Sequence, residues 1–198
     1  MKLDIILSGV GGQGILSIAT IIGAAAIRNG LFLKQSEVHG MAQRGGDVQS
    51  HLRIADHPIF SDLIPQGKAD LIISVEPLES LRYTTYLSPQ GWLITNTKPY
   101  LNITNYPPLE NVLAEIAQLP FHLTIDADQI ATELGSPLAM NMVILGAAAE
   151  FMPLSFQDLE QAIHTIFQKK GENVVNLNLN ALKKGNEIAK VQKNYLSK

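Results

Sequence analysis

The stretch that decides the fold lies at residues 3–14 and reads LDIILSGVGGQG. Its mostly apolar first half is typical of a short buried strand, and the glycine cluster that follows ends this strand. The cluster satisfies the pattern G-x-G-x-x-G through Gly9, Gly11 and Gly14. Residues 15–29 then predict a helix rich in alanine and isoleucine. A strand, a glycine turn and a helix in this order open a parallel sheet of the Rossmann type.

Further strands and helices follow along the whole chain. Apolar patterns predict strands at residues 31–35, 48–54, 69–75, 92–96 and 121–125, and helices at residues 77–87 and 109–118, two or three more between 128 and 168, and a last one at 177–193. The segment SPQG at residues 88–91 predicts a turn. We therefore expect one α/β domain over residues 1–198. Its predicted architecture is a three-layer α/β/α, Rossmann-like, mostly parallel sheet with helices on both faces.

Composition excludes several classes of function. The net charge is −3, so there is no basic field to hold nucleic acid. The longest apolar stretch, residues 15–27, is too short to span a bilayer, and the first residues lead into a strand and not a signal peptide. We therefore expect a cytoplasmic protein without nucleic-acid or membrane partners. Only 17% of the residues are charged, which indicates a surface partly covered by another protein.

The chain contains no cysteine. It therefore has no disulfide and no thiolate chemistry, and it lacks the ligands that hold iron–sulfur clusters. The histidines are His39, His51, His57, His122 and His164, and none has the spacing of a metal site. We predict that this chain by itself binds no metal or cofactor.

The glycine turn of Gly9, Gly11, Gly12, Gln13 and Gly14 has two interpretations. Glycines let a ligand approach the backbone, and the free amides at the start of a helix favour an anion, so the turn can bind a phosphate or a dinucleotide. An NAD site also needs an acid after the second strand, and Glu37 lies 23 residues beyond Gly14. Alternatively, the glycines serve only to make a tight turn and to let the helix pack closely on the sheet.

The most informative segment is residues 36–47, SEVHGMAQRGGD, which shows no apolar period and is predicted to be a loop. Its hydrogen-bonding side chains are Ser36, Glu37, His39, Gln43, Arg44 and Asp47. The loop follows the second strand, at the sheet edge where ligands bind in α/β folds. Arg44 can form a forked contact with a carboxylate or phosphate, and Gly45 and Gly46 permit close approach. The alternative is a solvated loop in which Arg44 pairs with Glu37 or Asp47 and His39 is structural.

These two segments together resemble the gamma-type domain of the pyruvate and 2-ketoacid:ferredoxin oxidoreductases. The segment EVHGM at residues 37–41 is most similar to the indolepyruvate branch of that family, in its beta subunits. The resemblance continues through DLIIS at residues 70–74 with Glu76-Pro77, and through Asn141-Met142 before LGA at residues 145–147. It covers nearly the whole chain.

The resemblance implies a division of labour between two subunits. In this family a 2-oxoacid is decarboxylated on thiamine diphosphate with Mg, the acyl group passes to coenzyme A, and iron–sulfur clusters carry electrons to ferredoxin. A large partner subunit holds the thiamine and the clusters. This chain has no thiamine-type motif and no cysteine, so it is expected to be the supporting subunit of the hetero-oligomer and inactive alone. The apolar helix surfaces also allow a homodimer of the isolated chain.

We therefore predict that the segment at residues 36–47 docks at the active site of the partner. His39 and Arg44 are the candidates to contact a substrate carboxylate, a coenzyme A phosphate or the partner, and the glycine turn binds a phosphate or the partner. No catalytic residue is assigned to this chain. Two alternatives remain: a free-standing NAD(P)-binding oxidoreductase, which predicts nucleotide binding by the isolated chain, and a scaffold protein, which predicts no thiamine-carrying partner.

Overall fold

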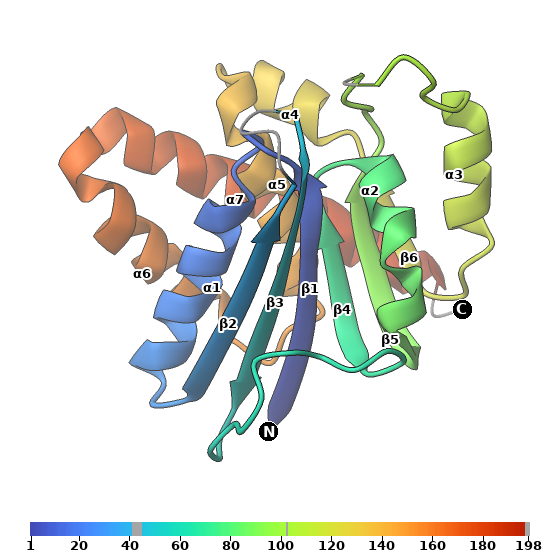
Figure 1. Ribbon diagram of the computed structural model, residues 1–198. Coiled ribbons are helices and arrows are strands. Elements are labelled where there is room, and N and C mark those ends of the chain that lie inside the picture. The colour runs from blue at the N-terminus through green and yellow to red at the C-terminus, as the bar shows by residue number, and fades with distance from the viewer. Residues whose placement is uncertain (41–44, 102, 197–198) are drawn as a thin grey trace.

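The computed structural model describes residues 1–40, 45–101 and 103–196, and it is built around a six-stranded sheet (Figure 1). The strands are β1 (Lys2–Val10), β2 (Phe32–His39), β3 (Asp47–Ala55), β4 (Ala69–Ser74), β5 (Leu87–Asn96) and β6 (His122–Ile125), in the order β2-β3-β1-β4-β5-β6. The pairs β1–β4, β4–β5 and β5–β6 are parallel. β3 is antiparallel to both of its neighbours, β1 and β2. The sheet is therefore mostly parallel, and β3 is the strand that runs in the opposite direction.

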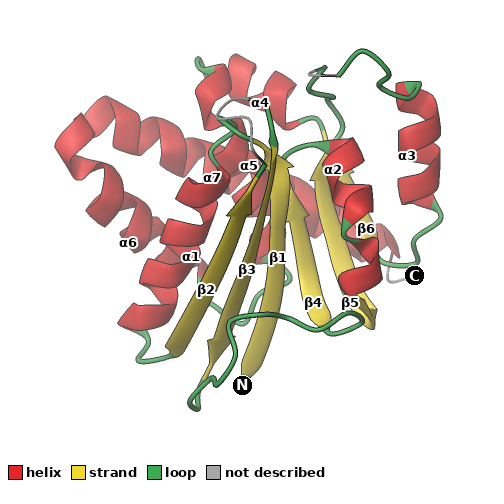
Figure 2. Cartoon of the chain, viewed as in Figure 1, coloured by secondary structure: helices red, strands yellow, loops and turns green. Residues whose placement is uncertain are grey.

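Helices cover both faces of the sheet, which confirms the predicted three-layer α/β/α class (Figure 2). One face carries α1 (Ile15–Arg28), α4 (Ala127–Glu133), α5 (Met140–Ala149), α6 (Phe156–Phe167) and α7 (Glu172–Leu196). The other face carries α2 (Pro77–Arg82) and α3 (Leu109–Ala117). Single turns of 3-10 helix lie at Thr84–Tyr86, Pro137–Ala139 and Gln168–Lys170. No helix in these described ranges is long and apolar enough to cross a membrane.

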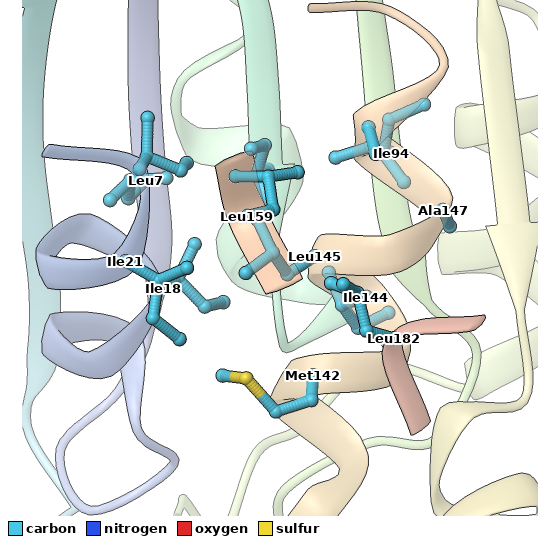
Figure 3. Close-up of a cluster of buried hydrophobic side chains, with 14 of the residues drawn as sticks. Leu7, Ile18, Ile21, Ile94, Met142, Ile144, Leu145, Ala147, Leu159 and Leu182 are labelled. Atoms are coloured by element: carbon cyan, nitrogen blue, oxygen red, sulfur yellow. The ribbon is translucent and has the colours of Figure 1, made fainter. Parts of the chain in front are cut away.

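Strand alternation divides the core in two. Ile5 and Leu7 of β1 point into the larger cluster, and Ile6 between them points into the smaller cluster beneath α2 and α3. The larger cluster is centred on α5, whose ten residues are all buried (Figure 3). A helix that is apolar on every side belongs in the middle of a domain, and here it separates the sheet from α7.

The prediction of a loop over residues 36–47 was wrong for most of the described part of this segment, because residues 36–39 and 47 lie in strands. β2 continues to His39 and β3 begins at Asp47, so that Ser36, Glu37 and His39 lie in a β-hairpin. β2 is an edge strand in which no residue is fully buried. Its side chains therefore show no apolar alternation, and the cross-strand hydrogen bonds that define it leave no trace in the composition.

The predicted opening unit also differs in one respect. β2 runs in the same direction as β1, because both are antiparallel to β3, but β3 lies between them. Nine residues of β1 pair with β3, from Lys2 opposite Ala55 to Val10 opposite Asp47. The connection through α1 therefore joins β1 to a strand two positions away, and β3 occupies the position between them.

Several boundaries also moved. Residues 88–91, predicted as a turn, belong to β5, whose pairing with β4 is irregular between Ala69 and Leu71. α2 ends at Arg82, earlier than predicted, and α7 begins at Glu172, also earlier than predicted. The helix at α3 and the strands β4 and β6 agree with prediction to within one residue.

Candidate functional site

The glycine turn lies at the edge of the sheet where the parallel strands β1, β4, β5 and β6 have their carboxyl ends, at the top of Figure 1. Gly14 has a φ of +82°, and a Cβ there would lie 2.3 Å from Asn141 Nδ2. Gly12 has a φ of +100°, but a Cβ there would meet no atom within 4 Å. Gly14 is therefore required by both conformation and packing. Gly12 serves the turn alone and leaves open space beside the backbone.

Some amides of the turn are used by the protein, and others are free. Gln13 holds the turn closed, since its Oε1 accepts a hydrogen bond from Val10 N at 2.8 Å. Gly11 N donates to Gly46 O at 2.8 Å, which ties the turn to the hairpin. The N–H groups of Ile15 and Leu16, the first two residues of α1, donate no hydrogen bond to any described residue. They form a site where an anion is favoured.

The hairpin brings the second motif to this turn. A cavity of about 280 Å³, named here the hairpin pocket, opens between the glycine turn, the first turn of α1 and the ends of the hairpin. It is lined by Val10, Gly11, Gly12, Gly14, Ile15, Leu16, His39 and Val48. His39 therefore lies beside the turn, although 25 residues separate it from Gly14, because β3 pairs with both strands.

Glu37 and His39 form a polar pair on one face of β2. The Glu37 carboxylate contacts His39 Nε2 and accepts a hydrogen bond from Gln35 Nε2 at 3.3 Å. Gln35 Nε2 also donates to Ser50 Oγ at 3.2 Å. The His39 side chain remains 53% exposed. Because Nε2 is engaged by Glu37, Nδ1 is the ring nitrogen left for a ligand or a partner.

The other predicted residues are distributed differently. Ser36 lies on the opposite face of β2 from Glu37, so it is not brought to the hairpin pocket. Gly46 contacts the turn through its carbonyl, and Gly45 has a φ of +79° in the connection. Gln43 and Arg44 lie outside the described residues.

The side chain of Asp47 lies on the face of the sheet that carries α2. It pairs with Val10, its carbonyl oxygen accepts a hydrogen bond from Gly40 N at 2.8 Å, and its carboxylate lies near the hydroxyl of Tyr83, which follows α2. Burial, followed by the charges of Asp47 and Glu79, raises the pKa of Tyr83 to about 12, so this hydroxyl remains a donor. Asp47 therefore anchors the end of the hairpin.

Two buried polar residues at this edge were not predicted as site residues, although Glu76 is part of the segment that carries the family resemblance. Glu76 is 1% exposed, and its carboxylate accepts hydrogen bonds from the N–H of Glu79 at 2.7 Å and the hydroxyl of Tyr106 at 2.6 Å. Burial and this hydrogen bond raise the pKa of Tyr106. Asn96 donates to Asp128 Oδ2 at 2.7 Å. Glu76 follows a buried strand and Asn96 ends one. This position at the carboxyl end of a buried strand is the sequence signal by which they could have been predicted.

Exposed apolar side chains surround the same edge. They are Leu16, Val38, Tyr100, Leu101, Ile103 and Leu138. Leu101 is 74% exposed and Leu138 is 87% exposed. Large apolar side chains gathered around a polar pocket are typical of a protein–protein interface.

The structure disfavours a dinucleotide site. In such sites the acid follows a second strand that lies next to the first. Here β3 lies between β1 and β2, and the Glu37 carboxylate is occupied by His39 and Gln35. In the described part of the chain, no group of three or more histidine and acidic side chains could hold a metal ion.

Comparison with known proteins agrees with the motifs. The family model for pyruvate ferredoxin/flavodoxin oxidoreductases matches residues 4–188. Indolepyruvate oxidoreductase subunit IorB of Archaeoglobus fulgidus is 40% identical over 194 residues, which is 93% of this chain and 94% of that protein.

Two solved structures share the fold. The 2-oxoglutarate:ferredoxin oxidoreductase of Magnetococcus marinus, with 2-oxoglutarate, coenzyme A and succinyl-CoA bound, has a TM-score of 0.78 and 26% identity. The match covers 96% of this chain but 31% of that one, so this chain spans about a third of it. The gamma subunit of a keto/oxoacid ferredoxin oxidoreductase of Geobacter sulfurreducens has a TM-score of 0.70 and 25% identity, over 96% of this chain and 99% of that one. The chain therefore belongs to the pyruvate ferredoxin/flavodoxin oxidoreductase family.

Proposed function

We propose that this chain is the small subunit of a 2-oxoacid:ferredoxin oxidoreductase that acts on indolepyruvate or a related aryl pyruvate. The proposal is supported by the 40% identity to an indolepyruvate oxidoreductase subunit over almost the full length of both chains. Thiamine diphosphate, Mg and iron–sulfur clusters are assigned to a large partner subunit. The 198 residues include no cysteine, so their donor set does not fit an iron–sulfur cluster.

The partner docks at the carboxyl edge of the sheet. The observation that carries this assignment is the hairpin pocket, which joins the glycine turn to His39 within a rim of exposed apolar side chains. Burial of such a rim stabilises an interface by about 25 cal/mol for each Å² of apolar surface removed from water. The polar pocket then lies between the two subunits.

Within that interface the pocket binds an anion. The free N–H groups of Ile15 and Leu16 and the positive end of α1 favour a phosphate of coenzyme A, a substrate carboxylate or a carboxylate of the partner. Gly12 leaves the backbone open for close approach. Glu37 fixes the ring of His39 so that Nδ1 can hydrogen-bond the ligand or the partner. No covalent step is assigned to these residues.

In the sequence, Gln43 and Arg44 lie between Gly40 and Gly45. His39, which precedes Gly40, lines the hairpin pocket, and Gly46, which follows Gly45, contacts the glycine turn. We assign Arg44 to a forked contact with the same ligand or with the partner. In the complex with its large subunit, Arg44→Ala should lower 2-oxoacid-dependent reduction of ferredoxin by at least about tenfold, or 1.4 kcal/mol. The melting temperature of the small subunit should change by only a few degrees. Turnover equal to that of the unaltered complex would refute the assignment.

Docking at this edge is tested by assembly. Replacing both Leu101 and Leu138 by Glu places two charges on the rim without touching the core, because both side chains are largely exposed. Size-exclusion chromatography with the large subunit should then show separate peaks. The control carries Glu at Ile27 and Val191, which are exposed apolar residues on α1 and α7 outside the rim, and it should assemble normally. Normal assembly of the first variant would place the partner elsewhere.

The NAD(P)-binding alternative makes an opposite prediction. The isolated chain should then bind NADH or NADPH with a measurable heat in calorimetry. For the subunit proposed here, we expect no heat with either nucleotide, and oxidoreductase activity should require the large subunit.

A further inference from the structure

A second and larger cavity lies on the other side of the glycine turn. This cavity of about 710 Å³, named here the helix pocket, opens between the start of α1, the start of α5 and the start of α7. Its volume is within the range of small-molecule sites. It shares only Gly12 and Gly14 with the hairpin pocket, although Tyr100 and Leu138 of its lining also belong to the exposed apolar rim where the partner is proposed to dock.

Two buried asparagines supply hydrogen-bond acceptors to this pocket. Asn141 is 7% exposed and Asn178 is 8% exposed, and both line the cavity. Their Nδ2 atoms are occupied, since Asn141 donates to Gly14 O at 3.1 Å and Asn178 donates to Val174 O at 2.7 Å. Neither Oδ1 accepts a hydrogen bond from any residue that the structure describes. These side chains are largely buried but their Oδ1 atoms remain accessible, so they can accept hydrogen bonds from a ligand with N–H or O–H groups.

Donors and a cation line the same cavity. The Oε1 of Gln13 is bound by Val10 N, and its Nε2 has no acceptor among the described residues. Lys170 Nζ lies 5.3 Å from the centre of the Phe167 ring and forms no ion pair in the described part of the chain. These groups suit a carboxylate.

The remaining walls are mostly apolar, and the charge of Asp128 among them is only partly neutralised. Asp128 lines the pocket, but its Oδ2 accepts from Asn96 at 2.7 Å and its Oδ1 lies 3.7 Å from Lys98 Nζ. Apolar walls are formed by Leu138, Met140, Phe167, Val174 and Leu177. A ligand therefore needs an apolar body as well as polar groups at one end.

We propose that the helix pocket binds a small organic acid with an apolar body and an amino or hydroxyl group beside its carboxylate. The carboxylate pairs with Lys170 and Gln13 Nε2, and the amino or hydroxyl group donates to the Oδ1 atoms of Asn141 and Asn178. The remaining charge of Asp128 favours an ammonium group over a hydroxyl.

Three matched probes test this assignment: phenylalanine, phenyllactate and phenylpropionate, which differ only in an amino group, a hydroxyl group or neither. Each is titrated into the full isotope-labelled chain, and binding is followed by amide chemical shifts. We expect phenylalanine to bind tighter than phenyllactate, and both to bind at least about tenfold tighter than phenylpropionate, because the last has no group that can donate to the two asparagine oxygens. The largest shifts should fall on Ser17, Asn141 and Asn178.

Variants separate the two ends of the ligand. Asn178→Ala should weaken phenylalanine and phenyllactate by at least about tenfold and leave phenylpropionate within about twofold. Asn180→Ala, an exposed asparagine on the same helix, should change none of them. Lys170→Met should weaken all three probes, whereas Lys169→Met, which lies outside the pocket, should not.

Equal affinity for the three probes, no binding of any probe, or an Asn178→Ala variant that loses nothing would each overturn the proposal. The measurement uses the free chain and no turnover, so its failure leaves the subunit assignment intact. Failure of assembly with a large subunit would likewise leave this site unaffected.

Discussion

The contact between α5 and α7 differs from the β2–β3 hairpin in two respects. The two regions differ in how deeply their residues are buried and in the role of their glycines. All ten residues of α5 are buried, and Gly146 and Gly185 bring its backbone against that of α7. In β2 no residue is fully buried, and the glycines of the connection lie beside a polar pocket. The helix pair stabilises the domain by close packing, whereas the hairpin presents polar groups at an open edge. Substitutions in the first should affect folding, and substitutions in the second should affect function.

The largest effect is expected for Gly146→Ala. A Cβ at this position would lie 2.0 Å from the carbonyl oxygen of Leu182, so the two helices must separate. The free energy of unfolding should fall by about 3 kcal/mol or more, measured by urea denaturation with circular dichroism. The control is Gly30→Ala, where φ is +69° and no atom lies within 4 Å of the Cβ, and it should cost about 1 kcal/mol. Equal losses would mean that the close contact is not the source of stability.

Arg53→Met tests the far end of the hairpin. The guanidinium forms a forked contact with Asp4, with Nε 2.8 Å from Oδ1, and also binds the carbonyl oxygens of Ser61 and Leu63. Asp4 is 1% exposed, and among the described residues its carboxylate would keep only Lys2 as a partner. The free energy of unfolding should fall by about 2–3 kcal/mol.

The double variant Asp4→Asn, Arg53→Met serves as the control for this pair. It should recover part of the loss in a thermodynamic cycle, because the buried charge is then absent. Purely additive losses would show that Arg53 acts through its packing and not through Asp4.

His39→Gln should separate function from stability. The side chain is half exposed, so the free energy of unfolding should change by less than about 0.5 kcal/mol. Turnover of the assembled complex should fall by at least about tenfold. The matched control is His57→Gln, an exposed histidine paired with Asp56 at the opposite edge, which should keep full turnover. A destabilised chain with normal turnover would reverse the comparison between the two regions.

The smallest effect concerns His51, whose Nδ1 accepts a hydrogen bond from Ile64 N at 3.0 Å. Burial lowers its pKa below 6.5; Asp62 and Asp4 oppose this shift, and Arg53 adds to it. At a pH between the folded and the unfolded pKa of His51, the imidazole is protonated in the unfolded chain and neutral in the folded chain. This contribution to stability is therefore complete above about pH 6.5 and is lost as the pH falls toward the lower folded pKa.

The measurement is the difference in melting temperature between pH 7.5 and pH 5.5 for the unaltered chain and for His51→Gln. The melting temperature of the unaltered chain should fall more over this range than that of the variant, because only the unaltered chain protonates His51 on unfolding. His164→Gln, an exposed histidine on α6, should retain the dependence of the unaltered chain. An identical slope for His51→Gln would exclude this histidine as the source.

Sequence patterns predicted most of the fold because most strands are buried on both faces. Residues 69–75 are mostly apolar and residues 121–125 alternate between apolar and polar side chains, and β4 and β6 lie there. The hairpin was not predicted, because an edge strand needs no apolar alternation and the polar residues of β2 resemble those of a loop. The motif analysis named His39 and the glycine turn, which the hairpin pocket brings together. It also named Ser36, which the pleat directs to the other face.

The sequence by itself determined the α/β class, the glycine turn after the first strand and the family, because these depend on local patterns and on two long motifs. Only the tertiary structure decided that β3 lies between β1 and β2, that His39 shares a pocket with Gly12, and that two buried asparagines line a second cavity. The physical reason is that strand order and buried hydrogen bonds depend on contacts between residues far apart in the chain. Gly14 and Asn141, for example, are 127 residues apart and share a hydrogen bond that no local pattern encodes.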